Sequence, residues 1–246
     1  MTEHDRRVRA EQRERFDFAV IANWIPPGER VLDLGCGDGR LLRYLSETRD
    51  VTGYGVEIDR ESVLGCIRNG VDVIQMDIEC GLSGFEDASF EHVIISQALQ
   101  TMHTTERILG EMLRVAAEAV VSFPNFAYRT NRAAIAAGHM PVSEDLPYDW
   151  FDTPNVRFFT IVDFENLCAR LGIEIRERLA FDEAGLAAED LWGLSLSAPR
   201  TQALYMPDAV PDRETLTRYI ANGLKVFLKA YSTTPAQDLE QLAALL

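Results

Sequence analysis

Residues 33–39 read Asp-Leu-Gly-Cys-Gly-Asp-Gly, so three glycines stand at alternate positions immediately after the short apolar run 30–34. Residues 40–48 follow with the spacing of a helix. Glycine allows a turn to adopt unusual dihedral angles and lets the backbone touch a ligand without a Cβ in the way. The amides at the start of a helix add hydrogen-bond donors and a positive dipole end. The segment therefore predicts a strand–turn–helix unit whose turn binds a ligand.

The spacing of the glycines and one acid narrow the class of ligand. A dinucleotide-binding turn has the spacing G-x-G-x-x-G and holds a pyrophosphate on its amides. Here the spacing is G-x-G-x-G, and Asp33 lies inside the end of the strand. A carboxylate at that place disfavours phosphate and suits a cationic amino-acid group. The aminocarboxypropyl group of S-adenosylmethionine fits this description.

The rest of the chain to residue 206 alternates between short apolar strands and helical segments, which is typical of βαβ units and a parallel sheet. Further strands are expected at 51–57, 71–76, 90–96 and 119–123, and helices at 5–25, 60–69, 105–115 and 162–171. Two late strands, 173–181 and 201–206, would form a hairpin at one sheet edge. We therefore expect an α/β, Rossmann-like, seven-stranded and mostly parallel sheet in a domain spanning residues 1–206.

Residues 207–246 have a different pattern. Asp212 can cap a helix that carries one apolar stripe, comprising Leu216, Tyr219, Ile220, Leu224, Phe227, Leu228 and Tyr231. Residues 234–237 resemble a capping box before a second short helix. This pattern predicts a helical C-terminal extension. It either packs back on the domain or forms a contact with a partner or within a homodimer.

Acidic and apolar residues follow the other expected strands where each strand ends, and ligands of open α/β sheets lie across these ends. Glu57 can accept hydrogen bonds from the ribose hydroxyls, Asp77 from the adenine amino group, and Ser96 would lie under the sulfur. Ile78 offers a backbone amide and an apolar contact to the ring. The expected cofactor-binding residues are Asp33, Gly35, Cys36, Gly37, Glu57, Ile58, Asp77, Ile78 and Ser96.

The charge and the cysteines exclude several function classes. A net charge of −15 repels phosphate backbones and anionic membranes, so nucleic acid is not an expected partner. No apolar run reaches the roughly 18–20 residues that span a bilayer, and the N-terminus lacks the apolar segment of a secretory signal. The four cysteines form no CxxC pair, so no metal site is expected. We expect a cytoplasmic protein.

Beyond these general features, the chain resembles a known family. Residues 31–42, 57–59 and 77–78 look like the signature motifs of class I S-adenosylmethionine-dependent methyltransferases. Three further segments look like the methionine biosynthesis protein MetW family: Ser-Gln-Ala-Leu-Gln at 96–100, Val-Val-Ser-Phe-Pro-Asn-Phe at 120–126, and the block from Met-Pro-Val at 140 to Leu-Pro-Tyr-Asp-Trp-Phe-Asp-Thr-Pro-Asn at 146–155. The resemblance covers about residues 15–206.

The MetW resemblance implies an S-adenosylmethionine-binding (or S-adenosylhomocysteine-binding) accessory or regulatory subunit of homoserine O-acyltransferase in methionine biosynthesis. S-Adenosylmethionine is the downstream product of that pathway. The alternative is a methyltransferase that acts on a small molecule. Many such enzymes carry a histidine in a stretch resembling S-x-x-L-x-H, but Thr101 stands at that position here and His103 follows two residues later. No catalytic residue is therefore assigned.

The connection 140–155 is long and carries the aromatic residues Tyr148, Trp150 and Phe151. Long connections in compact domains are often functional. This one is expected to be a lid over an acceptor pocket, a contact surface for another protein, or a cover whose aromatic residues lie in the core.

Overall fold

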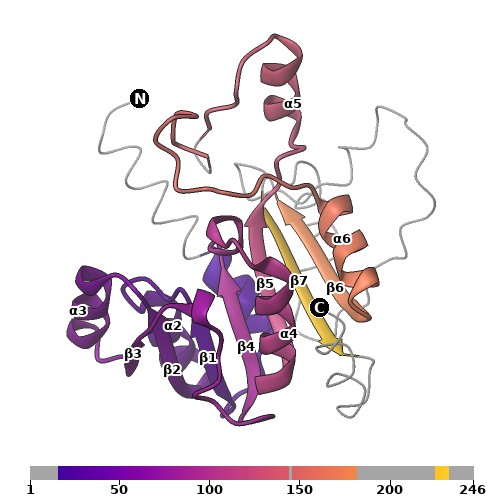
Figure 1. Ribbon diagram of the computed structural model, residues 1–246. Coiled ribbons are helices and arrows are strands. Elements are labelled where there is room, and N and C mark those ends of the chain that lie inside the picture. The colour runs from indigo at the N-terminus through magenta and orange to yellow at the C-terminus, as the bar shows by residue number, and fades with distance from the viewer. Residues whose placement is uncertain (1–15, 144–145, 182–224, 233–246) are drawn as a thin grey trace, which may run out of the picture.

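A computed structural model describes residues 16–143, 146–181 and 225–232 (Figure 1). Five of its strands run parallel in the order β3-β2-β1-β4-β5. Their bounds are Arg30–Leu34 (β1), Thr52–Glu57 (β2), Val73–Gln75 (β3), Phe90–Ser96 (β4) and Ala116–Pro124 (β5). The α/β Rossmann-like fold predicted from the sequence is confirmed. The strand order reverses between β1 and β4, and this is where ligands of open α/β sheets bind.

The helices lie on both faces of the sheet (Figure 1). They are α2 (Arg40–Arg49), α3 (Arg60–Arg68), α4 (Thr105–Val115), α5 (Arg129–Ala136) and α6 (Ile161–Arg170), with the 3₁₀ turns η1 (Ile78–Cys80) and η2 (Leu99–Thr101). Residues 16–24 are also helical. No helix within the described ranges is long and apolar enough to cross a membrane.

Neighbouring residues of each central strand are buried on opposite faces of the sheet. On one face, Leu32 and Leu34 join a core cluster with residues of α4 and α6. On the other, Val31 and Ile94 pack with residues 20–25 and with α2. Side chains alternate across a strand, and a parallel sheet is covered on both faces, so these strands have nearly continuous apolar sequences.

The sequence predicts a helix beyond residue 212. This prediction is wrong for residues 225–232, which are the part of that region that the structure describes. Lys225–Ser232 forms strand β7, which pairs antiparallel with β5 on one side and with β6 (Ile173–Phe181) on the other. The partner of β6 is thus β7, whereas the predicted strand 201–206 and the domain boundary at 206 lie outside the described residues. A short apolar run fits the periods of both a helix and a strand. Pairing with strands on both sides satisfies the backbone of β7.

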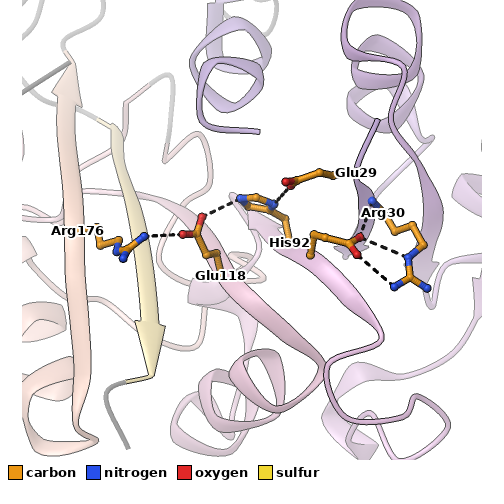
Figure 2. Close-up of polar contacts among 6 residues, drawn as sticks. Glu29, Arg30, His92, Glu118 and Arg176 are labelled. Atoms are coloured by element: carbon orange, nitrogen blue, oxygen red, sulfur yellow. Dashed lines mark hydrogen bonds and ion pairs between the residues drawn. The ribbon is translucent and has the colours of Figure 1, made fainter. Parts of the chain in front are cut away.

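A buried histidine links several strands near the amino ends of β1, β4 and β5 (Figure 2). His92, 3% exposed in β4, lies between two carboxylates: Nδ1 is 2.5 Å from Glu29 Oε2, and Nε2 is 3.0 Å from Glu118 Oε2. The second oxygen of Glu118 accepts a hydrogen bond from Arg176 of β6 at 2.8 Å. This network lies at the opposite end of the parallel strands from the glycine-rich turn, and it holds the sheet together rather than joining the candidate site.

Candidate cofactor site

The glycine-rich turn follows β1 and leads directly into α2, as the sequence predicts. Gly35, Gly37 and Gly39 all have positive φ angles, of 69°, 56° and 81°. The amides of Gly35 and Cys36 both donate to the carbonyl of Val56, at 2.8 and 3.1 Å. The turn is therefore fixed to the end of β2, beside Glu57.

The glycines of the turn differ in how much free space surrounds them. A Cβ on Gly37 would meet no atom within 4 Å. A Cβ on Gly35 would lie 3.1 Å from the Cβ of Ala98, and one on Gly39 would lie 3.1 Å from the sulfur of Cys66. In β2, a Cβ on Gly55 would lie 2.4 Å from the sulfur of Cys36. Gly37 thus borders open space, whereas its neighbours allow the turn to pack closely.

Glu57 binds the turn and the start of α3 together. Its Oε2 accepts a hydrogen bond from the amide of Gly37 at 2.9 Å. Its Oε1 accepts from the amides of Ile58 and Asp59, at 2.8 and 2.9 Å. A carboxylate oxygen has two lone pairs. Oε2 therefore keeps one acceptor position for a further donor, such as a hydroxyl group.

Asp33 is a buried carboxyl group, only 2% exposed, behind the turn. Burial, followed by the negative charge of Glu57, raises the pKa of Asp33 to about 7. No donor among the described residues makes a hydrogen bond to its carboxylate, and an ionised group in such a place is costly unless it is paired. A cationic ligand group would relieve this cost.

Two cysteines support the turn. The sulfurs of Cys36 and Cys66 lie 3.6 Å apart, and the Cys66 thiol donates to the carbonyl of Gly37 at 3.1 Å. Burial raises the pKa of both thiols, and the negative charge of Asp33 raises that of Cys36 further. Both thiols are therefore protonated and unreactive at neutral pH, so Cys36 contributes packing and its backbone amide. Among the residues the structure describes, no cluster of histidine, cysteine and acidic side chains is arranged to hold a metal.

The remaining predicted site residues lie at the ends of β2, β3 and β4. Ile58 is 61% exposed beside Glu57, whereas Ile78 is 7% exposed and packs in the core. An exposed apolar face for a ring is thus available on Ile58 and not on the side chain of Ile78. Asp77 caps η1, with Oδ1 accepting from the amide of Glu79 at 2.8 Å. The hydroxyl of Ser96 lies 3.0 Å from that of Ser122 in β5.

Two glutamines after β4 belong to the same edge and were not predicted from the sequence. Gln97 has a positive φ of 53°, and its amide donates to the carbonyl of Ser122 at 2.9 Å. The side-chain nitrogen of Gln100 donates to the carbonyl of Gln97 at 2.7 Å. Its oxygen is buried without a partner in the described part of the chain. No sequence pattern marks a left-handed glutamine, because the conformation depends on the contact with β5.

Thr101 and His103, the two residues at or near the expected position of a catalytic base, have different surroundings. The hydroxyl of Thr101 donates to the carbonyl of Ala98 at 2.8 Å. His103 is exposed, and its backbone amide is bound by Glu79.

Known structures share this fold. A methyltransferase from Archaeoglobus fulgidus that depends on S-adenosylmethionine (SAM) superposes with a TM-score of 0.57 at 16% identity, covering 90% of this chain and 93% of its own. An S-adenosylmethionine-dependent methyltransferase from Mesorhizobium loti gives a TM-score of 0.58 at 17% identity, covering 87% and 97%. At these identities the likeness concerns the fold alone.

Sequence comparisons identify the family. The bifunctional methionine biosynthesis protein MetXA/MetW of Rhodopirellula baltica is 39% identical over 176 residues, which are 68% of this chain. The match spans only 28% of the length of that relative. A family model described as methionine biosynthesis protein MetW matches residues 15–206. Because this model covers most of the chain, including the glycine-rich turn and both carboxylates of the candidate site, the chain belongs to the MetW family.

Proposed function

We propose that this chain binds S-adenosylmethionine, or S-adenosylhomocysteine, at the carboxyl ends of β1 to β4, and that it serves as a regulatory subunit of a homoserine O-acyltransferase in methionine biosynthesis. The observation that carries the binding proposal is the combination of the buried carboxyl group of Asp33 with Glu57, whose carboxylate accepts the amide of Gly37 beside open space.

Each part of the ligand has a suitable group in this arrangement. Asp33 suits the ammonium group, because an ionised carboxyl group at that buried position needs a cationic partner. The open acceptor position on Glu57 suits a ribose hydroxyl. The exposed side chain of Ile58 suits one face of the adenine ring, and Asp77 suits its amino group. When bound, S-adenosylmethionine supplies an electrophilic methyl group.

The regulatory role is supported by the family and by the fused relative, whose name joins MetXA and MetW in one chain. S-Adenosylmethionine is made from methionine, so its binding would report the output of the pathway to an early step. Regulation of this kind requires that the cofactor-bound and cofactor-free forms affect the acyltransferase differently. A coupling of this sort is a difference in binding free energy and needs no methyl transfer.

Methyl transfer to an oxygen acceptor usually needs a general base. The hydroxyl of Thr101 is occupied by a backbone carbonyl, and the side chain of His103 is exposed. The bond made by the hydroxyl of Thr101 argues against Thr101 as that base.

Calorimetry with S-adenosylmethionine tests the site, and the rate of homoserine acylation tests the role. The acyltransferase encoded in the same genome is assayed alone, with this protein, and with this protein plus the nucleoside. A change in rate on mixing that depends on the nucleoside is expected. Unchanged rates in all three mixtures would contradict the regulatory role, and release of S-adenosylhomocysteine with a metabolite extract would favour an enzyme.

A further inference from the structure

Residues 125–160 connect β5 to α6, and the described residues of this connection, 125–143 and 146–160, form a projection that we call the arm. It contains α5, and Figure 1 shows that α5 and the chain after it stand beyond the carboxyl end of β5. The sequence left open whether this connection is a lid, a contact surface or a cover with buried aromatic residues.

The base of the arm is packed into the domain. The amide of Phe126 donates to the carbonyl of Phe159 at 3.2 Å, and the rings of Phe126 and Phe158 lie 4.9 Å apart. The ring of Phe159 lies 4.6 Å from that of Phe123 in the core. Tyr128 is 2% exposed. The arm is therefore held in a defined position on the sheet.

The arm is also bound to the loop beside the cofactor site. The amides of Val156 and Arg157 both donate to the carbonyl of Gln100, at 3.0 and 2.9 Å. The guanidinium of Arg157 donates to the carbonyl of His103 at 3.0 Å. The side chain of Gln100 in turn donates to the carbonyl of Gln97, which directly follows Ser96 at the end of β4. A protein bound to the arm would thus lie next to the cofactor edge.

The arm carries several exposed apolar side chains. Trp150 is 72% exposed and Phe151 69%, and their rings meet edge to face with centroids 5.7 Å apart. Met140, Val142 and Tyr148 are exposed as well. The alternative in which the aromatic residues lie in the core is therefore wrong for this group. Exposed apolar groups of this kind mark interaction sites, and tryptophan and tyrosine dominate binding energy in protein interfaces.

We propose that the exposed apolar side chains of the arm (Met140, Val142, Tyr148, Trp150 and Phe151), which we call the docking face, form the surface on which homoserine O-acyltransferase docks. This inference rests on the proposed function. The acids Asp149 and Asp152 are exposed beside the two rings, so the face repels anionic membranes and nucleic acid. It fits a protein pocket that accepts two aromatic rings and presents arginine or lysine at its rim.

The fused relative supports a protein occupant. Its match to this chain takes up 28% of its length, so most of that polypeptide is a second protein part held beside the MetW-like part. Tethering raises the effective concentration of the two parts. Trp150 and Phe151 are large exposed aromatic side chains of the kind that anchor contacts between such parts.

The test compares the double variant Trp150→Ser/Phe151→Ser with a control, Ile67→Ser, which removes a 63% exposed apolar side chain from α3. Affinity for the purified acyltransferase and for S-adenosylmethionine is measured for each. The double variant is expected to lose at least about tenfold in affinity for the acyltransferase, with its affinity for S-adenosylmethionine and its unfolding temperature unchanged. The control is expected to bind both ligands as the wild type does.

Several results would overturn the inference. If the wild type binds the acyltransferase and the double variant binds it equally well, the docking face is wrong while the proposed function stands. If the wild type itself does not bind the acyltransferase, both fail. If sedimentation shows that the double variant only loses self-association, the face is a contact between two copies of this chain.

Discussion

The backbone amide of Gly37 donates a hydrogen bond to the carboxylate of Glu57, with 2.9 Å between N and Oε2. The bond joins the turn after β1 to the end of β2, so the two parts of the candidate site are held in a fixed relation. The same carboxylate accepts two amides at the start of α3. Glu57 is therefore a structural acceptor, and its remaining lone pair is the position that we propose for a donor of the ligand.

Replacing Glu57 by alanine should weaken both the site and the fold. Three backbone amides lose their acceptor, and each unsatisfied group costs about 1–3 kcal/mol when water cannot replace the partner. We expect the affinity for S-adenosylmethionine to fall at least about tenfold and the unfolding temperature to drop. Calorimetry and thermal unfolding measure these effects. Glu61→Ala, which removes an exposed acid from α3, is the control, and equal affinity in the two variants would contradict the assignment.

Comparing Gly37→Ala with Gly28→Ala distinguishes a loss of space for the ligand from a loss of stability caused by backbone strain. At Gly37 φ is +56° and a Cβ would meet no protein atom, while Gly28 has φ +81° and equally open surroundings away from the site. Both alanine variants should cost about 1–2 kcal/mol through their left-handed conformation. Only Gly37→Ala should lose S-adenosylmethionine binding, because its methyl group enters the space proposed for the ligand. Retained binding in Gly37→Ala would show that the ligand does not approach this glycine.

His92→Leu tests the network near the amino ends of the strands. Without the ring, the half-buried carboxylates of Glu29 and Glu118 would lose the imidazole that lies between them. Each partly exposed carboxylate loses a polar partner, and a group left unsatisfied in this way costs about 1–3 kcal/mol. Arg30→Ala, which breaks an exposed pair with Glu91, should cost about 0–1 kcal/mol. Chemical denaturation measures both, and S-adenosylmethionine affinity should be unchanged in each variant.

The geometry of the candidate site could be predicted where the signal is local. The glycine-rich turn could be predicted because it directly follows a short apolar strand. Glu57 could be predicted because it ends the next strand along the chain. The parallel sheet is readable for the same reason, since each strand–helix unit carries its own apolar pattern.

Features that depend on distant contacts could not be predicted. Lys225–Ser232 has an apolar pattern that also fits a helix, and its strand conformation comes from pairing with β5 and β6. The left-handed Gln97 is bonded to Ser122, the side chain of Gln100 is bonded to the carbonyl of Gln97, and the backbone carbonyl of Gln100 is bonded to the arm. No property of these glutamines alone distinguishes them from exposed glutamines.

Asp33 provides a prediction with a definite pH dependence. Its pKa is raised to about 7 in the folded protein, from an ordinary value of 3.8. A carboxyl group whose pKa is raised on folding stabilises the fold fully at pH values below 3.8, and that contribution is lost as the pH rises towards 7. Asp33→Asn removes the ionisable group, so the variant should be more stable than the wild type at pH 8, by up to about 4 kcal/mol. The difference should shrink as the pH is lowered to 4.

Ligand binding should change with pH in the opposite sense. The ammonium group pairs with the ionised form of Asp33, so the affinity of the wild type for S-adenosylmethionine should rise between pH 6 and 8, and binding near pH 7 should release protons. Calorimetry in two buffers with different ionisation enthalpies measures that release. Asp33→Asn should bind weakly at every pH, with no proton release. A variant that is more stable at pH 8 and still binds tightly would show that the buried carboxyl group does not serve the ligand.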